Sequence, residues 1–299
     1  MQVWMRAMNR CCGHELRKPS EHSAQVGVVL TVLLVCAHSE RLSAEPLGRS
    51  WPARHQISMD KIGHSSFDGL LRKYVDTDGY VDYTAWKASH ADRQTLIDYL
   101  VTLGKANPQA LASKQAKLAF WINAYNAVTI EGILREYPTS SIRNHTARLV
   151  GYNIWKDLPL IVGGRQYSLD SMEHQVLRKM NEPRIHFAIV CASIGCPRLL
   201  NRAYVSDRLD EQLTGNARDF FSRAQNLRTD SASGTLLVSS ILDWFGEDFG
   251  SSTKQQGAYL KPYLPAAAQR VVDSGRLRFR YLDYNWNLND QKSKRHTGK

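Results

Sequence analysis

The chain has 299 residues, of which 43% are hydrophobic, 22% charged and 9% aromatic, and its formal net charge is +11. This composition excludes collagen-like, low-complexity and polytopic membrane proteins, and it predicts a soluble globular chain. The length is sufficient for one large domain or two small ones, each with a substantial core.

The N-terminal region predicts export. Four basic residues precede an uncharged stretch of 14 residues at Ala24–Ala37, and the small residues Ser43 and Ala44 follow it. This order is typical of a secretory signal peptide. A helix of 14 residues rises only about 21 Å, whereas the hydrocarbon layer of a bilayer is about 30 Å thick. We therefore expect residues 1–44 to be a signal peptide and leader, and the protein to be periplasmic or secreted. The alternatives are a membrane anchor at residues 24–37 or a buried helix.

Removal of this leader would change the charge and the cysteine content. The remaining chain would keep 34 of 39 basic and 25 of 28 acidic residues, a net charge of +9, and its only cysteines would be Cys191 and Cys196. The positive charge suits an anionic envelope polymer or membrane surface. The basic residues are spread along the chain, which together with export disfavours nucleic acid as a partner.

The apolar periodicity predicts a helix-rich α+β fold. We expect a single globular domain over residues 60–285 with a small, mostly antiparallel sheet around a long buried helix, and a basic tail at residues 286–299. The predicted helices are Ser65–Val75, Arg93–Ala106, Lys114–Tyr137, Asp170–Met180, Ser206–Ala224 and Lys254–Leu264. The predicted strands are Leu160–Val162, Gln166–Ser168, His186–Ala192, Thr235–Ser239 and Leu277–Leu282, the first two joined by a hairpin turn at Gly163–Gly164.

The helix Lys114–Tyr137 has no continuous polar face in its middle, so it is expected to be buried. Asn123 and Asn126 lie three residues apart in this region and point to the same side. A buried amide without a partner costs about 1–3 kcal/mol, so both amides must find hydrogen bonds. Their partners are either loop backbone or a bound group.

The segment Asp76–Asp82 resembles the middle of a calcium-binding loop, with three carboxylates at alternating positions and a turn glycine. The outer positions carry Tyr74 and Ala85 instead of calcium ligands. We therefore interpret the segment as a glycine-containing turn that leads into a short strand.

The region from His186 to Pro197 contains most of the reactive residue types. If His186–Ala192 is a strand, the side chains of His186 and Cys191 lie on opposite faces. A direct pair of the two would then require a bulge or an early end of the strand. Cys196 follows the turn at Gly195 and is the freer candidate nucleophile. Ser193, between the cysteines, is a candidate binding residue.

Cys191 and Cys196 are also candidates for a disulfide. The five steps between them span about 16 Å when extended, so the chain would have to reverse, which Gly195 allows. Their spacing and the lack of a second nearby ligand pair disfavour a zinc site. We predict no metal and no cofactor.

The segment Asp170–His174 begins a helix after the hairpin. A glutamate near a helix N-terminus, here Glu173, is favoured by the helix dipole. The functional alternative makes Glu173 a partner that orients His186 or accepts its proton. Histidine has a pKa that suits general base catalysis, although a histidine in an apolar strand is more often a core residue.

Several blocks, taken in order, resemble the family called domain of unknown function 547. They are Val81–Tyr83, Phe120–Asn126, Ser168–Asp170 with Glu173–His174, His186–Ala188, Cys191–Ser193 with Cys196–Pro197, and Ile241–Phe245 with Asp248–Phe249. The likeness covers roughly Ser65–Leu264 and implies an exported bacterial member of an uncharacterised family, without a settled activity. At the level of fold alone, a buried helix on a sheet that presents histidine is similar to papain and transglutaminases. This helix, however, carries Asn123 and no cysteine.

Two functions remain open. In the first, the protein is a binding or scaffold domain of the envelope, in which the cysteines are bridged and His186, Asn123 and Glu173 form a buried polar network. In the second, it is a thiol-dependent hydrolase or transferase that acts on a peptide or amide. Cys196 or Cys191 would then be the nucleophile and His186 the base, with Glu173 as its orienter and Asn123 as a hydrogen-bond donor to the oxyanion or substrate. The sequence predicts neither the partner nor the oligomeric state.

Overall fold

A computed structural model of the chain describes residues 44–146 and 152–297. The predicted signal peptide, with its apolar stretch Ala24–Ala37, lies outside the described residues. Within the described ranges, no helix combines the length and the apolar character needed to cross a membrane. These residues all belong to one compact unit.

The helix α5 (Lys114–Glu136) forms the centre of the core, as the sequence predicts, and it ends one residue earlier than expected. It begins where the Ser113 side chain accepts a hydrogen bond of 3.0 Å from the Ala116 N–H. Pro138 follows its C-terminus. Every residue from Leu118 to Leu134 is buried. A helix that is apolar on all sides needs packing partners all round, and these come from both halves of the chain.

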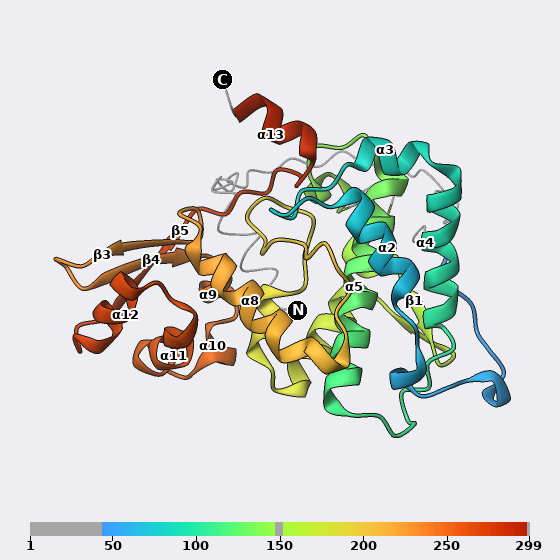
Figure 1. Cartoon of the computed structure of the whole chain (residues 1–299), viewed down its shortest axis with the longest axis horizontal. Coiled ribbons are helices and arrows are strands. Elements are labelled where there is room, and N and C mark those ends of the chain that lie inside the picture. The colour runs from blue at the N-terminus through green and yellow to red at the C-terminus, as the bar shows by residue number, and fades with distance from the viewer. Residues whose placement is uncertain (1–43, 147–151, 298–299) are drawn as a thin grey trace, which may run out of the picture. The chain divides into compact units, whose positions relative to one another are not determined.

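The N-terminal helices cover one side of α5. They are α2 (Ser65–Tyr74), α3 (Tyr83–Ala88) and α4 (His90–Leu103), and α3 and α4 contact α5 directly (Figure 1). The helix α4 starts three residues before the predicted Arg93 because Ser89 caps it, its side chain accepting a hydrogen bond from the Asp92 N–H. The short helix α3 was not predicted from the periodicity, since six residues are too few to show a clear helical pattern.

A hairpin and an irregular helix follow α6 (Ile154–Asp157). The antiparallel strands β1 (Leu160–Val162) and β2 (Arg165–Tyr167) are joined by Gly163 and Gly164, whose φ angles of 56° and 79° confirm the predicted turn. The helical stretch predicted at Asp170–Met180 is present. It consists of α7 (Leu169–Ser171), a π-helical segment at Met172–Leu177 and a 3-10 turn at Arg178–Met180.

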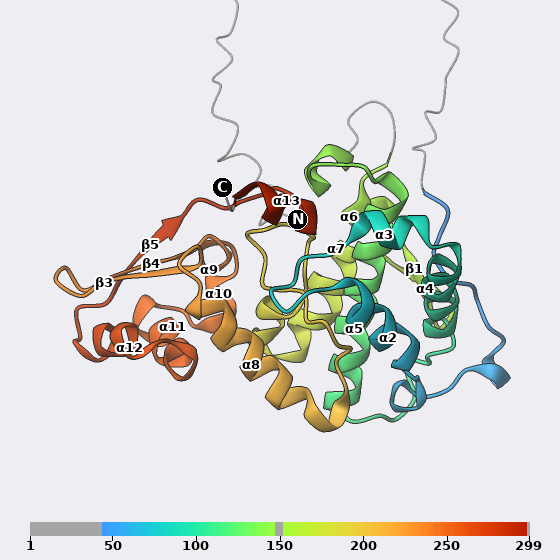
Figure 2. The same cartoon turned by 45° about the horizontal axis from the view of Figure 1, so that its top comes forward.

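The C-terminal half contains a three-stranded mixed sheet. Strand β4 (Thr235–Ser239) pairs antiparallel with β3 (Leu227–Asp230) and parallel with β5 (Arg278–Leu282). The predicted α+β class is confirmed. The predicted position of the sheet is wrong, because β3–β5 lie at one end of the molecule, beside α12 and away from the central α5 (Figures 1 and 2). The helices of this half are α8 (Leu209–Ser222), α9 (Ile241–Trp244), α10 (Gly246–Phe249), α11 (Thr253–Leu260) and α12 (Ala266–Asp273).

The strand predicted at His186–Ala192 is wrong. Pro183–Phe187 forms a 3-10 helix, with Pro183 at its start and the Glu182 side chain accepting a hydrogen bond from the Arg184 N–H. Irregular chain continues to Pro197. All residues from Ile185 to Ser193 are buried. The apolar run therefore indicates burial, but it does not indicate the conformation of the backbone. Further 3-10 turns lie at Ala53–His55, Met59–Lys61, Ile142–His145, Ser206–Arg208 and Lys261–Tyr263.

The chain beyond residue 286, predicted as a basic tail, packs against the body where it begins. Leu288, Asn289 and Asp290 are buried. The Asn289 amide binds Tyr83 and the Gly79 carbonyl, and the Leu288 N–H donates to the Ser140 carbonyl. The helix α13 (Gln291–Thr297) follows. The C-terminal segment therefore closes over the same end of the molecule as the turn at Gly79.

We expect Ser113→Ala to lower the free energy of unfolding by about 1 kcal/mol, because it removes the N-cap of the central helix. Ser113 is exposed, so no loss of core packing should accompany the change. Urea denaturation of both proteins measures the difference. The matched variant Ser113→Asp can accept the same hydrogen bond and should retain most of the stability. An equal loss in both variants would show that the cap does not stabilise α5.

Candidate functional site

Both asparagines of α5 bind loop backbone. The Asn123 amide donates to the Tyr204 carbonyl at 2.8 Å and accepts from the Tyr204 N–H at 2.9 Å. The Asn126 amide donates to the Ala188 carbonyl and accepts from the Val190 N–H, each at 3.0 Å. Each amide group thus holds one of the two loops that cross the buried helix. In this arrangement the Asn123 amide is occupied and is not a free donor for an oxyanion.

His186 lies in a carboxylate–guanidinium cluster that the sequence did not predict. Its Nε2 is 2.7 Å from Asp248 Oδ2. Arg178 donates from Nε and Nη2 to the two oxygens of the same Asp248 carboxylate, both at 2.7 Å. The Phe245 ring stacks on the imidazole, with 4.3 Å between the ring centroids. The functional alternative made Glu173 the partner of His186, whereas the hydrogen-bond partner of this imidazole is Asp248.

Burial and the ion pair between Arg178 and Asp248 determine which groups of this cluster are charged. Burial of the imidazole lowers the pKa of His186, and the hydrogen bond to Asp248 only partly opposes this. Burial acts to raise the pKa of Asp248, but the hydrogen bonds from His186 and Arg178 outweigh it and hold that pKa well below its usual range. The arrangement is therefore a carboxylate paired with a permanent guanidinium cation and a neutral imidazole.

Glu173 lies elsewhere in the core. Its Oε2 accepts a hydrogen bond of 3.2 Å from the Tyr125 hydroxyl of α5. Only 3% of the residue is exposed. Burial raises the pKa of the Glu173 carboxyl to about 8, and the tyrosine hydrogen bond counteracts only part of the shift. At neutral pH this side chain is mostly a protonated, uncharged acid in the interior.

The two cysteines meet in a tight cluster with a serine and a tyrosine. Their sulfurs are 2.6 Å apart, and both are free cysteines. The Tyr284 hydroxyl donates to Cys196 Sγ at 3.0 Å and lies 3.3 Å from Cys191 Sγ. The Ser193 hydroxyl is 3.1 Å from Cys191 Sγ and 3.4 Å from Cys196 Sγ. The chain therefore reverses between the cysteines, as a bridge between them would require.

The two thiols differ in acidity. Burial and the neighbouring Cys196 raise the pKa of Cys191. Burial also acts to raise the pKa of Cys196, but hydrogen bonds from Cys191, Ser193 and Tyr284 outweigh it and lower that pKa below its ordinary value. Of the two sulfurs, Cys196 is therefore the one that carries the negative charge first.

The structure brings together some of the predicted site residues and separates others. The sulfurs share a cluster with Ser193, whereas the hydrogen bonds of His186 and Glu173 go to Asp248 and Tyr125. Sequence reasoning missed Asp248 and Tyr284. Asp248 belongs to a block already noted for its resemblance to the family and was a detectable candidate. Tyr284 reaches the sulfurs from more than 80 residues away, without a signal in the local pattern.

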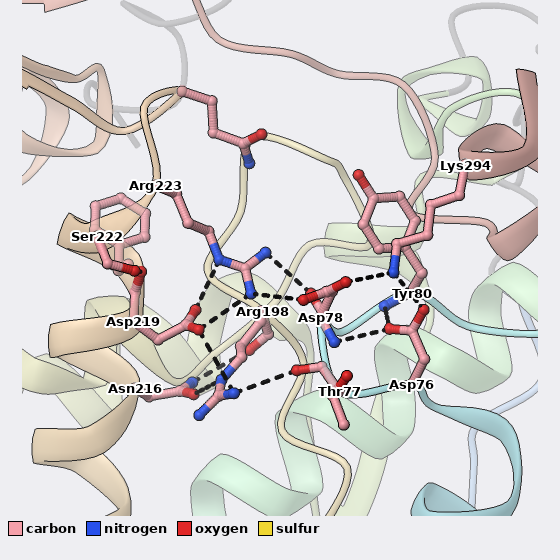
Figure 3. A network of polar contacts seen from close by, with 12 residues as sticks. Asp76, Thr77, Asp78, Tyr80, Arg198, Asn216, Asp219, Ser222, Arg223 and Lys294 are labelled. Carbon is pink, nitrogen blue, oxygen red and sulfur yellow. Dashed lines mark hydrogen bonds and ion pairs between the residues drawn. The ribbon is translucent and has the colours of Figure 1, made fainter. Parts of the chain in front are cut away.

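The calcium-loop-like segment forms a turn whose carboxylates are all paired within the protein. Asp76 accepts from the Asp78 and Tyr80 N–H groups, and the Asp82 side chain caps α3. Lys294 donates to both Asp76 and Asp78 at 2.7 and 2.6 Å (Figure 3). The short strand predicted after the turn is wrong, because Val81 makes only isolated bridges.

The described parts of the chain contain no group of three or more His, Cys, Asp or Glu side chains that is able to hold a metal ion.

A cavity of about 420 Å³ lies beside the cysteine loop. Ile194 of that loop lines it, together with Asn285, Asn287 and Leu288 of the C-terminal segment. None of the predicted catalytic side chains reaches it. This cavity is therefore not a cleft in which thiol, imidazole and carboxyl groups meet.

The protonated Glu173 generates a prediction about pH. Because its carboxyl has a pKa of about 8 in the folded protein and an ordinary pKa of 4.5, the folded state holds a proton that the unfolded state releases. This effect makes stability fall as the pH rises from about 4.5 to 8. Glu173→Gln should remove this pH dependence. The free energy of unfolding of the variant should therefore increase relative to that of the wild type as the pH rises through that range. Urea denaturation at several pH values measures the difference, and a constant difference would contradict the raised pKa.

The comparison with known families identifies only part of the chain. Residues 108–221 match the model described as "Protein of unknown function, DUF547". No curated protein and no solved structure matches the chain. The matched segment includes α5, His186 and both cysteines, whereas Asp248 and Tyr284 lie outside it. The match supports membership of the DUF547 family through residues 108–221, which are less than half of the chain.

Proposed function

We propose that this protein is exported to the cell envelope and acts there as a binding or scaffold domain, with its reactive residues serving as a buried polar network. The observation that carries the proposal is that each of these side chains is paired within the protein. Asn123 binds Tyr204, His186 binds Asp248, and Glu173 binds Tyr125. Buried polar groups that satisfy one another stabilise one arrangement of the core.

The positions of the thiols and the imidazole also support this reading. Acyl transfer by a cysteine depends on a base within hydrogen-bond reach of the sulfur. The sulfurs of Cys191 and Cys196 hydrogen-bond Ser193 and Tyr284, and the His186 Nε2 hydrogen-bonds Asp248. The imidazole thus has a structural partner of its own. Its stacking on Phe245 and its burial are typical of a core residue.

A thiol-dependent hydrolase or transferase acting on a peptide or amide is the second candidate. One observation favours it: the Cys196 sulfur accepts hydrogen bonds from the Cys191 N–H and the Tyr284 hydroxyl, both at 3.0 Å. Such donors stabilise a thiolate, which is the nucleophilic form. In this reading His186 would have to act from its place beside Asp248.

The variant His186→Ala distinguishes the two candidates. In a scaffold the change should lower the free energy of unfolding by about 2–4 kcal/mol, because it leaves a cavity under Phe245 and removes a partner of Asp248. The alkylation rate of Cys196 in the reduced, folded protein should stay within about twofold of the wild type, because in a scaffold His186 does not activate this sulfur. Thermal unfolding and the rate of iodoacetamide labelling measure the two effects.

The matched control is His174→Ala, which removes a less buried imidazole that contacts Arg178 on the same helical segment. It should cost less stability and leave labelling unchanged. A tenfold loss of Cys196 labelling in folded His186→Ala, with normal labelling in His174→Ala, would overturn the scaffold proposal and favour the enzyme.

We base the proposal of export on the leader sequence, and we base the proposed class of partner on the net charge of the chain without that leader. A chain that loses residues 1–44 has a net charge of +9, from 34 basic and 25 acidic residues. This positive surplus supports an anionic envelope component as the partner, since opposite charges speed encounter and strengthen weak contacts.

We expect the full chain, expressed in a bacterium, to be cleaved near Ala44 and released into the periplasm, because its basic region and short apolar core are typical of an export signal. Fractionation and N-terminal sequencing of the purified protein check this outcome. The variant Val29→Arg places a charge in the apolar core and should leave the protein unprocessed in the cytoplasm. Uncleaved protein in the membrane fraction would instead favour an anchor at residues 24–37.

A further inference from the structure

The loop between the two cysteines is shaped so that their sulfurs meet. Ala192 has a left-handed backbone with a φ of 58°, and the Cys196 N–H donates to the Ser193 carbonyl at 3.1 Å. This turn reverses the chain and leaves the sulfurs 2.6 Å apart. The turn is fixed from outside as well, because the Ile194 and Gly195 N–H groups donate to the carbonyls of Asn287 and Asn285. The two sulfurs are therefore held together by the fold.

The surroundings of the two sulfurs are unequal. Cys196 Sγ accepts from the Cys191 N–H and from the Tyr284 hydroxyl, both at 3.0 Å, and the Ser193 hydroxyl lies 3.4 Å away. Hydrogen-bond donors favour the thiolate over the thiol. Cys191 has no comparable backbone donor in the described structure, and its thiol lies beside the sulfur that would carry the charge. Cys196 is thus the sulfur suited to attack a disulfide first, and Cys191 is suited to attack in a second step.

We propose that Cys191 and Cys196 form a dithiol that exchanges reversibly with small-molecule disulfides, with Cys196 as the attacking residue and Cys191 as the resolving residue. This inference goes beyond the proposed function and does not depend on it, since a binding domain and an enzyme are each able to contain such a pair. The oxidant is a low-molecular-weight disulfide of the glutathione type. Each cysteine is about 6–7% exposed, which suits a small disulfide better than a protein one.

The exchange proceeds in two balanced steps. First, the Cys196 thiolate attacks one sulfur of the disulfide, a mixed disulfide forms, and one thiolate leaves with its electron pair. That thiolate takes up the proton that Cys191 loses. Second, the Cys191 thiolate attacks Cys196 Sγ and displaces the remaining thiolate, which takes a proton from water. The protein dithiol is oxidised by two electrons and the disulfide is reduced to two thiols.

Trypsin places both cysteines in one peptide, Ile185–Arg198, so mass spectrometry reads their state directly. The reduced, folded protein is treated with oxidised glutathione and then with iodoacetamide. We expect this peptide to lack both alkyl groups and to be lighter by two hydrogen atoms than the untreated dithiol form, and dithiothreitol to reverse the change. A peptide that still carries two alkyl groups after oxidation would overturn the proposal.

Single variants test the order of attack. Cys191→Ser should accumulate the mixed disulfide on Cys196, because the resolving thiol is missing. Cys196→Ser should form a mixed disulfide on Cys191 at least tenfold more slowly, because that sulfur has no backbone N–H donor like the one that Cys196 accepts from. Equal rates in the two variants would overturn the assigned roles.

Tyr284→Phe tests the geometry without removing either thiol. We expect its mixed disulfide to form about three- to tenfold more slowly at neutral pH, because one donor to Cys196 is lost. The difference should shrink at a pH where both thiols are ionised. A difference that stays constant with pH would show that Tyr284 has only a packing role, and it would count against stabilisation of the Cys196 thiolate.

Discussion

The structure depends on hydrogen bonds from the central helix to the two loops that cross it. A helix buried on every side normally offers only apolar contacts, and buried loop backbone has no strand to satisfy its N–H and C=O groups. Asn123 and Asn126 solve both problems, because each amide pairs with a donor and an acceptor of the loop backbone. Loss of either amide would leave two buried backbone groups without partners, at about 1–3 kcal/mol each.

The Asn126 contact explains how the reactive segment is placed. It fixes the chain at Ala188 and Val190, directly between His186 and Cys191. On one side the 3-10 helix turns the imidazole toward Asp248, and on the other the turn at Ala192 directs the sulfurs toward Tyr284. One fixed point in the core therefore separates two clusters that are close in sequence.

The clusters differ in what they are able to do. The His186–Asp248–Arg178 group joins two 3-10 segments, Arg178–Met180 and Pro183–Phe187, to α10. The Asp248 carboxylate pairs with a guanidinium and an imidazole, which is an arrangement that stabilises contact between elements. The sulfur cluster contains a pair of redox-active atoms with unequal donors. Both are completed by residues outside the segment that matches the family model, since Asp248 and Tyr284 follow residue 221.

The sequence by itself determined the elements whose pattern is local. The burial and N-cap of α5, the glycine hairpin and the strand β4 at Thr235–Ser239 all follow from apolar spacing and from residues with special backbone or capping properties. The α+β class follows from the same signals. The apolar run His186–Ala192 is buried, but the strand predicted for it is wrong, because buried apolar residues look alike in a strand and in irregular chain.

Only the tertiary structure decided which polar groups meet. Asp248 reaches His186 across 62 residues, and Tyr284 reaches Cys196 across 88. Such pairs leave no periodicity, because their distance in the chain is set by the elements that happen to lie between them. The sequence supplied the reactive residue types, and the packing of α5 against its loops determined their partners, since a hydrogen bond depends on positions in space and not on order along the chain.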